Sequence, residues 1–349
     1  MDMVALQTYF EEFHDAIKLE DENEILREKR DILIKKLRDR LQEICEDPPT
    51  FVEFNKGGYA MNLGVKPLDS DYDIDVGLEF QIKKDDYPNP VVVKQWVFDA
   101  LYGHTDDVKI KKPCVTVQYH QNDEPLYHVD FAVYAGDGYS NNIYLARGKP
   151  TSPDVEKKWE IDDPKGLIKV ITERFSDKKD REQFRRVIRD LKRWKDVKFS
   201  PNGHSAPIGV SLAVCGYHWF SVSKVLSDAV KMSYEYNDLE AMLGLVNAMI
   251  DRFRAVSVED GKTLFRLKSD LPVQPYNDLF QKMSDIQMTD LKEKLERLRD
   301  TLMAARDETD PREACMILRR QFGDDFPLPE IEETAQKRGP AIISSSSSA

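Results

Sequence analysis

The hydrophobic and polar positions divide the chain into a mixed first half and a helical second half. Residues 21–46 predict a long amphipathic helix that ends at EDPP and carries one apolar stripe, formed by Leu26, Leu33, Leu37 and Ile44. Four segments with alternating or continuous apolar residues between turn residues predict strands, at 50–57, 72–80, 113–120 and 126–135. Residues 94–104 predict a helix between two of these strands.

From about residue 162 onward the apolar spacing is helical. It predicts six helices, at 164–174, 180–197, 208–225, 238–256, 288–307 and 311–322. The sequences GHSAP and SDLPVQPYND predict loops, and the serine-rich end predicts a flexible tail. We therefore expect three parts: residues 1–160, 161–328 and 329–349.

Composition limits the class of protein. The 349 residues include 41% hydrophobic and 33% charged side chains, which is ordinary for a globular protein. The net charge of -12 argues against a stable nucleic-acid partner, because phosphate neutralisation needs a basic surface, although a local basic cleft stays possible. The acidic N-terminus lacks a signal pattern, and no apolar run reaches the roughly 18 residues of a membrane span. We expect a cytoplasmic protein without a membrane partner.

Four cysteines are widely spaced and show no CxxC pattern or other zinc-ligand spacing. Such spacing is typical of unpaired core thiols in a reducing compartment. The four residues are Cys45, Cys114, Cys215 and Cys315.

Four aspartates within seven residues, DSDYDID, precede an apolar strand. In an extended strand, residues two apart share a face, so Asp73 and Asp75 point one way while Ile74 and Val76 enter a core. Asp69 and Asp71 belong to the turn that leads in. Two carboxylates roughly 7 Å apart repel each other, and a divalent cation would remove that repulsion. The alternative is a solvated strand edge.

A third carboxylate, Asp130, lies in the apolar sequence YHVDFAVY. His128 shares its face, and Val129 and Phe131 share the other face. A carboxylate in such a strand needs a partner. Three carboxylates on neighbouring strands suit a two-magnesium centre for nucleotidyl transfer, in which Asp130 serves the second ion and assists deprotonation of the attacking hydroxyl. The alternative is a structural pair between Asp130 and a core arginine or lysine.

The paired glycines Gly57 and Gly58 follow the first predicted strand. Glycine permits a positive φ and a close backbone approach, so amide groups at this turn can face a phosphate. Alone, such a pair more often marks an ordinary turn. Its position, 16 residues before Asp73, adds to its value.

A basic segment, residues 178–198, carries ten Lys and Arg residues in 21 positions. Its apolar stripe consists of Phe184, Val187, Ile188, Leu191 and Trp194. A basic row lies beside this stripe, formed by Arg181, Arg185, Arg189 and Lys192. Such a row can line a cleft and meet a polyphosphate, or it can be a solvated face paired with acidic neighbours. Lys192 and Arg189, nearest the buried edge, are the candidates for phosphate contact.

In this order, the motifs resemble the nucleotidyltransferase superfamily of polymerase-β type. The segments KGGYAMNLGVKPLDSDYDIDVG, HVDFAVYA, YLARGK to KKWEIDDPKG, and FRRVIRDLKRWKD are similar to the bacterial cGAS/DncV-like nucleotidyltransferases (CD-NTases) of anti-phage signalling systems. The likeness is strongest to the cyclic GMP-AMP synthase branch and runs from the first long helix to RRQFGDDFPLP.

The resemblance implies an α+β fold. A polymerase-β-like mixed sheet with a long N-terminal spine helix would pack against a helical, OAS-like C-terminal domain. The implied reaction joins two or three ribonucleoside triphosphates, such as ATP and GTP, cyclises them and releases pyrophosphate. Asp73 and Asp75 match the family's metal-binding pair and Asp130 its third carboxylate. They imply two Mg²⁺ ions as cofactors, with Mn²⁺ as a substitute.

Further matches imply nucleotide contacts. Gly57 and Gly58 match the phosphate-cradling turn, and Lys192 matches a lysine that contacts the triphosphate. Arg147 matches a nucleotide-contacting arginine, and Tyr59 is a candidate base-stacking neighbour.

Two positions depart from the family. Gly58 stands where serine is usual, so backbone amides must replace one hydroxyl contact. Gly209 stands where the cyclic GMP-AMP synthase branch carries a nucleotide-facing serine, which leaves the base preference open.

Some family members act beside a ubiquitin-transfer-like ligase, which would make the terminal Ala349 a conjugation site. A merely disordered terminus is the alternative. Two other functions stay open at this point: a polymerase-β-like terminal nucleotidyltransferase acting on RNA, and a non-catalytic module that binds nucleotides or a partner.

Overall fold

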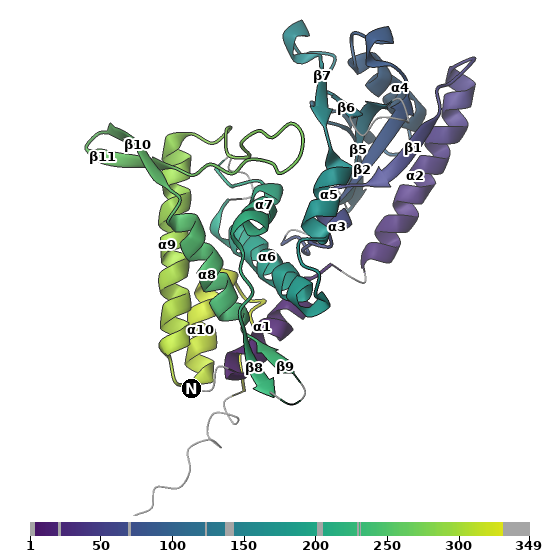
Figure 1. The fold of residues 1–349 in the computed structure, drawn as a ribbon. Helices are drawn as coiled ribbons and strands as arrows, with labels where there is room; N and C mark the ends of the chain where they lie inside the picture. The colour runs from purple at the N-terminus through teal and green to yellow at the C-terminus, as the bar shows by residue number, and fades with distance from the viewer. Residues whose placement is uncertain are drawn as a thin grey trace, which may run out of the picture.

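The computed structural model describes residues 4–330, apart from 20–21, 69–70, 123, 137–142, 201–204, 229 and 231. The predicted tail from 331 to Ala349, together with Asp69, lies outside the described residues. Figure 1 shows a sheet flanked by two helices on the right and a helical half on the left. The α+β class is confirmed.

A mixed seven-stranded sheet forms the first half, in the order β1-β2-β5-β4-β3, with β6 on β5 and β7 on β6. Strands β2 and β5 are parallel, and the other pairs are antiparallel. The predicted strands are present as β1 (Phe51–Asn55), β2 (Tyr72–Gln81), β4 (Val115–Gln121) and β5 (Glu124–Gly136). Three short strands escaped prediction: β3 (Asp107–Ile110), β6 (Ile143–Ala146) and β7 (Trp159–Asp162).

Helices α2 (Glu22–Ile44) and α4 (Val91–Leu101) pack against the strands in one hydrophobic core. Ile74 and Val76 of β2 lie in this core, as the alternation predicted. The predicted stripe of α2 holds for Leu26, Leu33 and Leu37. Ile44 is exposed, because it is the last residue of the helix.

The helical half contains α5 (Pro164–Thr172), α6 (Lys178–Lys198), α7 (Gly209–Trp219), α8 (Asp238–Ile250), α9 (Asp285–Asp307) and α10 (Pro311–Phe322). The predicted helices 208–225 and 238–256 are too long. The first is followed by a hairpin of β8 (Lys224–Asp228) and β9 (Ser233–Tyr236), the second by one of β10 (Arg254–Glu259) and β11 (Lys262–Arg266). Asp260 and Gly261 both have positive φ and close the second hairpin, as a two-residue turn requires.

Helix α1 (Val4–Ile17) escaped prediction and packs in the core of the helical half. Its Phe10 and Phe13 meet Phe322 and Phe326, with ring centroids 5.0–6.4 Å apart. Residues 4–17 are therefore packed with the second half, although the sequence grouped them with the first. The boundary at 160/161 itself stays a prediction.

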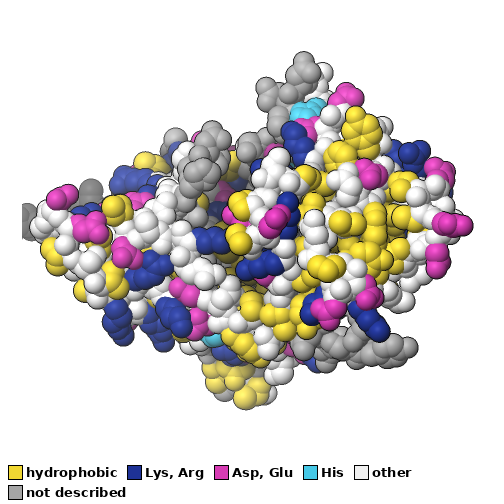
Figure 2. Space-filling model, turned by 90° about the horizontal axis from the view of Figure 1, so that it is seen from above, with side chains coloured by type: hydrophobic (Ala, Val, Ile, Leu, Met, Phe, Trp, Pro, Cys, Tyr) yellow, Lys and Arg dark blue, Asp and Glu magenta, His cyan; other side chains and the backbone are white. Residues whose placement is uncertain are grey.

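All four cysteines are free, and three of them are buried, as expected for unpaired core thiols; Cys45 is half-buried. No helix in the described part of the chain has the length and hydropathy needed to cross a membrane. Figure 2 looks onto the molecule from above. Basic and acidic side chains are interspersed across the left and the middle of this face, and hydrophobic side chains gather on the right.

Candidate active site

The sheet brings the three predicted aspartates to one place. In the parallel pair of β2 and β5, Asp75 is opposite Asp130, and Asp73 is opposite His128. Paired residues on neighbouring strands share a face, and the neighbouring Ile74, Val76, Val129 and Phe131 are buried in the core on the other face. The alternation argument is therefore correct for both strands.

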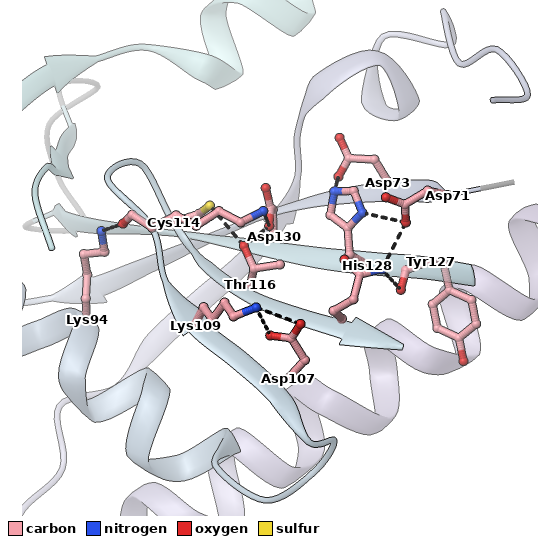
Figure 3. Close-up of polar contacts among 12 residues, drawn as sticks. Asp71, Asp73, Lys94, Asp107, Lys109, Cys114, Thr116, Tyr127, His128 and Asp130 are labelled. Carbon is pink, nitrogen blue, oxygen red and sulfur yellow. Dashed lines mark hydrogen bonds and ion pairs between the residues drawn. The ribbon is translucent and has the colours of Figure 1, made fainter. Parts of the chain in front are cut away.

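His128 lies between two carboxylates (Figure 3). Its Nδ1 is 3.1 Å from Asp71 Oδ1, and its Nε2 is 3.2 Å from Asp73 Oδ1. Burial alone would lower the pKa of His128, but the hydrogen bonds and charges of Asp73, Asp71 and Asp130 raise it to about 9. The imidazole is therefore a cation at neutral pH and offsets part of the charge of the cluster.

Asp75 is the carboxylate most affected by its surroundings. Burial, and then the charge of Asp73, raises its pKa to about 7, while the Lys56 ammonium opposes the shift. Burial and the charge of Asp73 thus both disfavour the ionised form of Asp75. A bound cation would favour the ionised form and so lower this pKa again.

Asp130 is paired with a hydroxyl. Thr116, opposite it on β4, donates its hydroxyl to Asp130 Oδ1 at 2.5 Å. Lys111 Nζ lies 4.0 Å from the same oxygen, on a side chain that is 48% exposed. Among the described residues, Asp130 therefore does not form the alternative structural pair with a core arginine or lysine.

The glycine turn is a four-residue helix, α3 (Gly57–Ala60), in direct contact with Asp75. Gly57 has φ +64°, and a Cβ there would lie 1.9 Å from Asp75 Oδ2. The Lys56 amide also donates to the Asp75 carbonyl at 3.0 Å. The predicted positive φ is present at Gly57, and the absence of a side chain lets the turn lie against the carboxylate.

Lys192 reaches this turn from α6. Its side chain is half-buried, and its Nζ donates to the Leu63 carbonyl at 2.7 Å. Burial, and then the charge of Lys195, lowers the pKa of Lys192 to about 8. Arg181 and Arg189 of the same basic row donate to main-chain carbonyls, so these members of the row fix α6 to neighbouring loops.

A cleft of about 470 Å³ lies between the two halves. One wall carries Asp73, Asp75 and the glycine turn, and another carries Lys192 and the start of α7. Its apolar lining comes from Met61, Pro164, Leu167, Ile168, Ile208, Val210, Leu271 and Leu279. A cleft lined by both charged groups and aliphatic side chains suits a ligand with a polyphosphate and an apolar ring.

Six of the ten predicted site residues line this cleft: Gly57, Gly58, Asp73, Asp75, Lys192 and Gly209. Asp130 lies next to Asp75 on the neighbouring strand. Tyr59 and Arg189 line a separate pocket of about 220 Å³ together with Arg27. Arg147 is paired with Glu160 at 3.1 Å and is not among the residues that line either cavity.

Sequence reasoning missed a second polar group in the cleft. Lys56 Nζ donates to the Tyr134 hydroxyl at 2.6 Å, and Tyr134 donates to Asp162 Oδ2 at 2.9 Å. Lys56 and Asp162 both line the cleft. Lys56 could have been noticed because it precedes the glycine turn. Asp162 gives no comparable signal, because β7 is four residues long.

A metal ion would find oxygen ligands here. Ligand atoms of Asp73, His128 and Asp130 lie within 4.8 Å of one another. The grouping therefore contains His128 in place of the predicted Asp75. Because the His128 cation donates to carboxylates, it is a partner of the ligands; the hard oxygens of the aspartates suit Mg²⁺ or Mn²⁺. The raised pKa of Asp75 is a further sign that the residues fit a cation.

Comparison with known proteins shows what this part of the chain is similar to. A family model described as "Cyclic GMP-AMP synthase DncV-like, nucleotidyltransferase domain" matches residues 50–134, which include the glycine turn and all three aspartates. Residues 50–134 are thus similar to a DncV-like nucleotidyltransferase domain, which agrees with the resemblance noted in the sequence.

Individual relatives agree. A cyclic GMP-AMP synthase of Escherichia albertii is 29% identical over 187 residues, an alignment that spans 50% of this chain and only 38% of that relative. The CD-NTase CdnG of Bradyrhizobium diazoefficiens, solved with GTP, matches with a TM-score of 0.66 at 15% identity, over 91% of this chain and 96% of that chain.

Vibrio cholerae DncV cyclic AMP-GMP synthase, solved with the linear intermediate 5' pppA(3',5')pG, matches with a TM-score of 0.65 at 18% identity. This match covers 90% of the present chain and 93% of the Vibrio chain. The described chain therefore has the polymerase-β-like CD-NTase fold over nearly its whole length, as the sequence predicted.

Proposed function

We propose that this protein is a magnesium-dependent nucleotidyltransferase that joins ribonucleoside triphosphates and cyclises them into a cyclic di- or trinucleotide. One observation carries the proposal: Asp73, Asp75 and Asp130 share one face of β2 and β5, beside a cleft lined by both halves. Relatives with this fold are described as cyclic dinucleotide synthases, and one holds a linear dinucleotide intermediate.

The residues of the chain have distinct tasks in this reaction. Asp73, Asp75 and Asp130 would hold Mg²⁺, which when bound neutralises the triphosphate and lowers the pKa of the attacking hydroxyl. The glycine turn presents its backbone to the phosphates, and Lys192 of α6 supplies a cation beside this turn. The hydroxyl oxygen bonds to the α-phosphorus, its proton passes towards Asp130, and pyrophosphate leaves. After one such transfer, or two for a trinucleotide, the free hydroxyl of the linear product attacks the remaining α-phosphorus, a further pyrophosphate leaves and the ring closes.

The biological setting belongs to the same proposal. We place the enzyme in the cytoplasm and in anti-phage signalling, on the basis of its resemblance to CD-NTases. Conjugation of Ala349 by a ubiquitin-transfer-like ligase is a prediction about residues outside the described part of the chain.

Mass spectrometry of a reaction with ATP, GTP, CTP, UTP and Mg²⁺ tests the function. We expect a phosphatase-resistant cyclic product from the wild type. Asp73→Asn and Asp75→Asn should each reduce its formation by at least about 100-fold, the order of loss when charge stabilisation of a transition state is removed. Asp107→Asn, which changes a sheet carboxylate paired with Lys109, is the matched control and should remain active.

Two results would contradict the proposal. If both site variants keep full activity, the aspartates are not the metal ligands. If labelled RNA is extended while no cyclic product forms, the protein is instead a terminal nucleotidyltransferase.

A further inference from the structure

The ammonium of Lys192 lies between two glycines from different elements. A Cβ on Gly58, in α3, would stand 2.9 Å from Lys192 Nζ. A Cβ on Gly209, the first residue of α7, would stand 3.2 Å from Lys192 Cε and 3.8 Å from Nζ. Residues 58, 192 and 209 are far apart in sequence, and the fold brings them together on the wall of the cleft.

Backbone conformation does not require glycine at either position. The glycines with positive φ in the described residues are 57, 103, 148, 261 and 323, so Gly58 and Gly209 have backbone angles that other residues adopt. Both lie in helical turns, where glycine is less favourable than alanine. The feature that glycine supplies at both positions is therefore space beside Lys192.

The ammonium has capacity for a further ligand. It carries three N–H donors, and the hydrogen bond found for it among the described residues goes to the Leu63 carbonyl. No carboxylate in the described part of the chain forms an ion pair with it. A half-buried cation with donors to spare, at the edge of a cleft, favours an anionic ligand.

We propose that Gly58 and Gly209 are positioning residues for Lys192. Together they leave the space in which the ammonium contacts the Leu63 carbonyl and a phosphate oxygen of the bound nucleoside triphosphate at the same time. The inference rests on the proposed function. Both glycines then have the same role, which is to leave space for the Lys192 side chain. At position 58 the ammonium occupies the space that a side chain would take.

The consequence is specific to nucleotide binding. A Cβ at position 58 meets the mobile end of a flexible side chain, so the protein can fold around it by moving the ammonium. The displaced cation then loses its charge-assisted hydrogen bond to phosphate. This loss should weaken triphosphate binding ~10- to 100-fold and raise KM more than it lowers kcat.

The experiment measures binding of ATP and GTP analogues with a methylene bridge between the α- and β-phosphates, in the presence of Mg²⁺, by calorimetry. The variants are Gly58→Ala, Gly209→Ala, Lys192→Met and the two double variants that combine each alanine with Lys192→Met. Gly244→Ala is the matched control, because a Cβ at this helical glycine meets no atom within 4 Å. Thermal melting of each variant checks folding.

We expect Gly58→Ala and Gly209→Ala to weaken binding in the wild-type background and to have little further effect when Lys192→Met is present. Such non-additivity shows that the glycines act through the lysine, whereas a merely structural role would give additive losses. Additive losses, or unchanged binding in both alanine variants, would overturn the inference while leaving the proposed function intact. A wild type that binds neither analogue and makes no cyclic product would overturn both.

Discussion

At the scale of single residues, the contact between Gly57 and Asp75 explains why the turn begins with glycine. The position has φ +64°, a backbone conformation that is strained for any residue with a side chain. In addition, a Cβ there would lie 1.9 Å from Asp75 Oδ2 and overlap the carboxylate. The positive φ and the contact with Asp75 are two separate reasons for glycine at position 57. An experiment can separate them, because another glycine of the chain has a positive φ but no such contact.

Gly57→Ala should lower the free energy of unfolding by about 1–3 kcal/mol and displace Asp75. Gly103→Ala is the matched control, since Gly103 has φ +72° but no atom within 4 Å of its added Cβ. Urea unfolding should show that backbone strain lowers the free energy of unfolding in both variants. Product formation should fall in Gly57→Ala alone; equal activity in the two would contradict the role of the contact.

Asp75→Asn should make the protein more stable at neutral and alkaline pH while removing activity. Folding raises the pKa of Asp75 from 3.8 to about 7, so the folded state holds the proton more tightly. The resulting stabilisation is complete below about pH 4 and is lost as the pH rises through about 7.

The variant should therefore exceed the wild type in free energy of unfolding by about 2–4 kcal/mol at pH 8 without Mg²⁺. At pH 4 the two should be close. Urea titrations at both pH values measure the difference, and a variant that is less stable at pH 8 would show that the burial of this charge is already offset.

At the scale of elements, helix α1 is attached to α6 through a buried histidine. Arg189 donates from its guanidinium to His14 Nε2, with the nitrogens 3.1 Å apart. Burial, and then the charge of Arg189, lowers the pKa of His14 to about 3. The histidine is therefore neutral in the folded protein and becomes charged on unfolding in mild acid.

This burial should make the fold sensitive to acid. Between about pH 6.5 and pH 3 the unfolded chain binds a proton at His14 that the folded chain does not, so stability falls as the pH falls. His14→Gln should reduce the loss of unfolding free energy between pH 7.5 and 4.5 by about 1–3 kcal/mol. His120→Gln, at an exposed histidine, should leave the wild-type loss unchanged. Equal losses in both variants would contradict the assignment.

At the scale of the whole molecule, the cleft depends on both halves. Its carboxylates come from β2 and β7, its lysines from α6 and from the residue before α3, and much of its apolar lining from α5, α7 and the loop before α9. A ligand that fills the cleft must therefore restrain both halves at once.

Hydrogen exchange with Mg²⁺ and the methylene-bridged GTP analogue should show this coupling. We expect slower exchange at residues 57–63 and at the start of α7, because both segments border the cleft. The double variant with Asp73→Asn and Asp75→Asn should lose most of the protection in both segments. Protection confined to the sheet half would mean that the ligand does not bridge the halves.

Local patterns carried the prediction of the main elements and of the metal face. Alternation along residues 72–80 and 126–135 places Asp73, Asp75 and Asp130 opposite a buried face, and the strands have this arrangement. Predictions failed where one local pattern fits two structures. Residues 220–225 continue an apolar spacing, yet α7 ends at Trp219 and a hairpin follows.

Local repeat patterns were enough to predict the α+β class, the strand that carries the DxD pair and the apolar stripe of α6, because each depends on the repeat of a single element. The packing of separate elements places His128 between Asp71 and Asp73, sets α1 in the helical half, and puts Tyr59 and Arg189 at a separate pocket. The position of Lys192 between Gly58 and Gly209 is of the same kind. These contacts join residues from separate elements, and their geometry depends on how those elements pack, which no local periodicity contains.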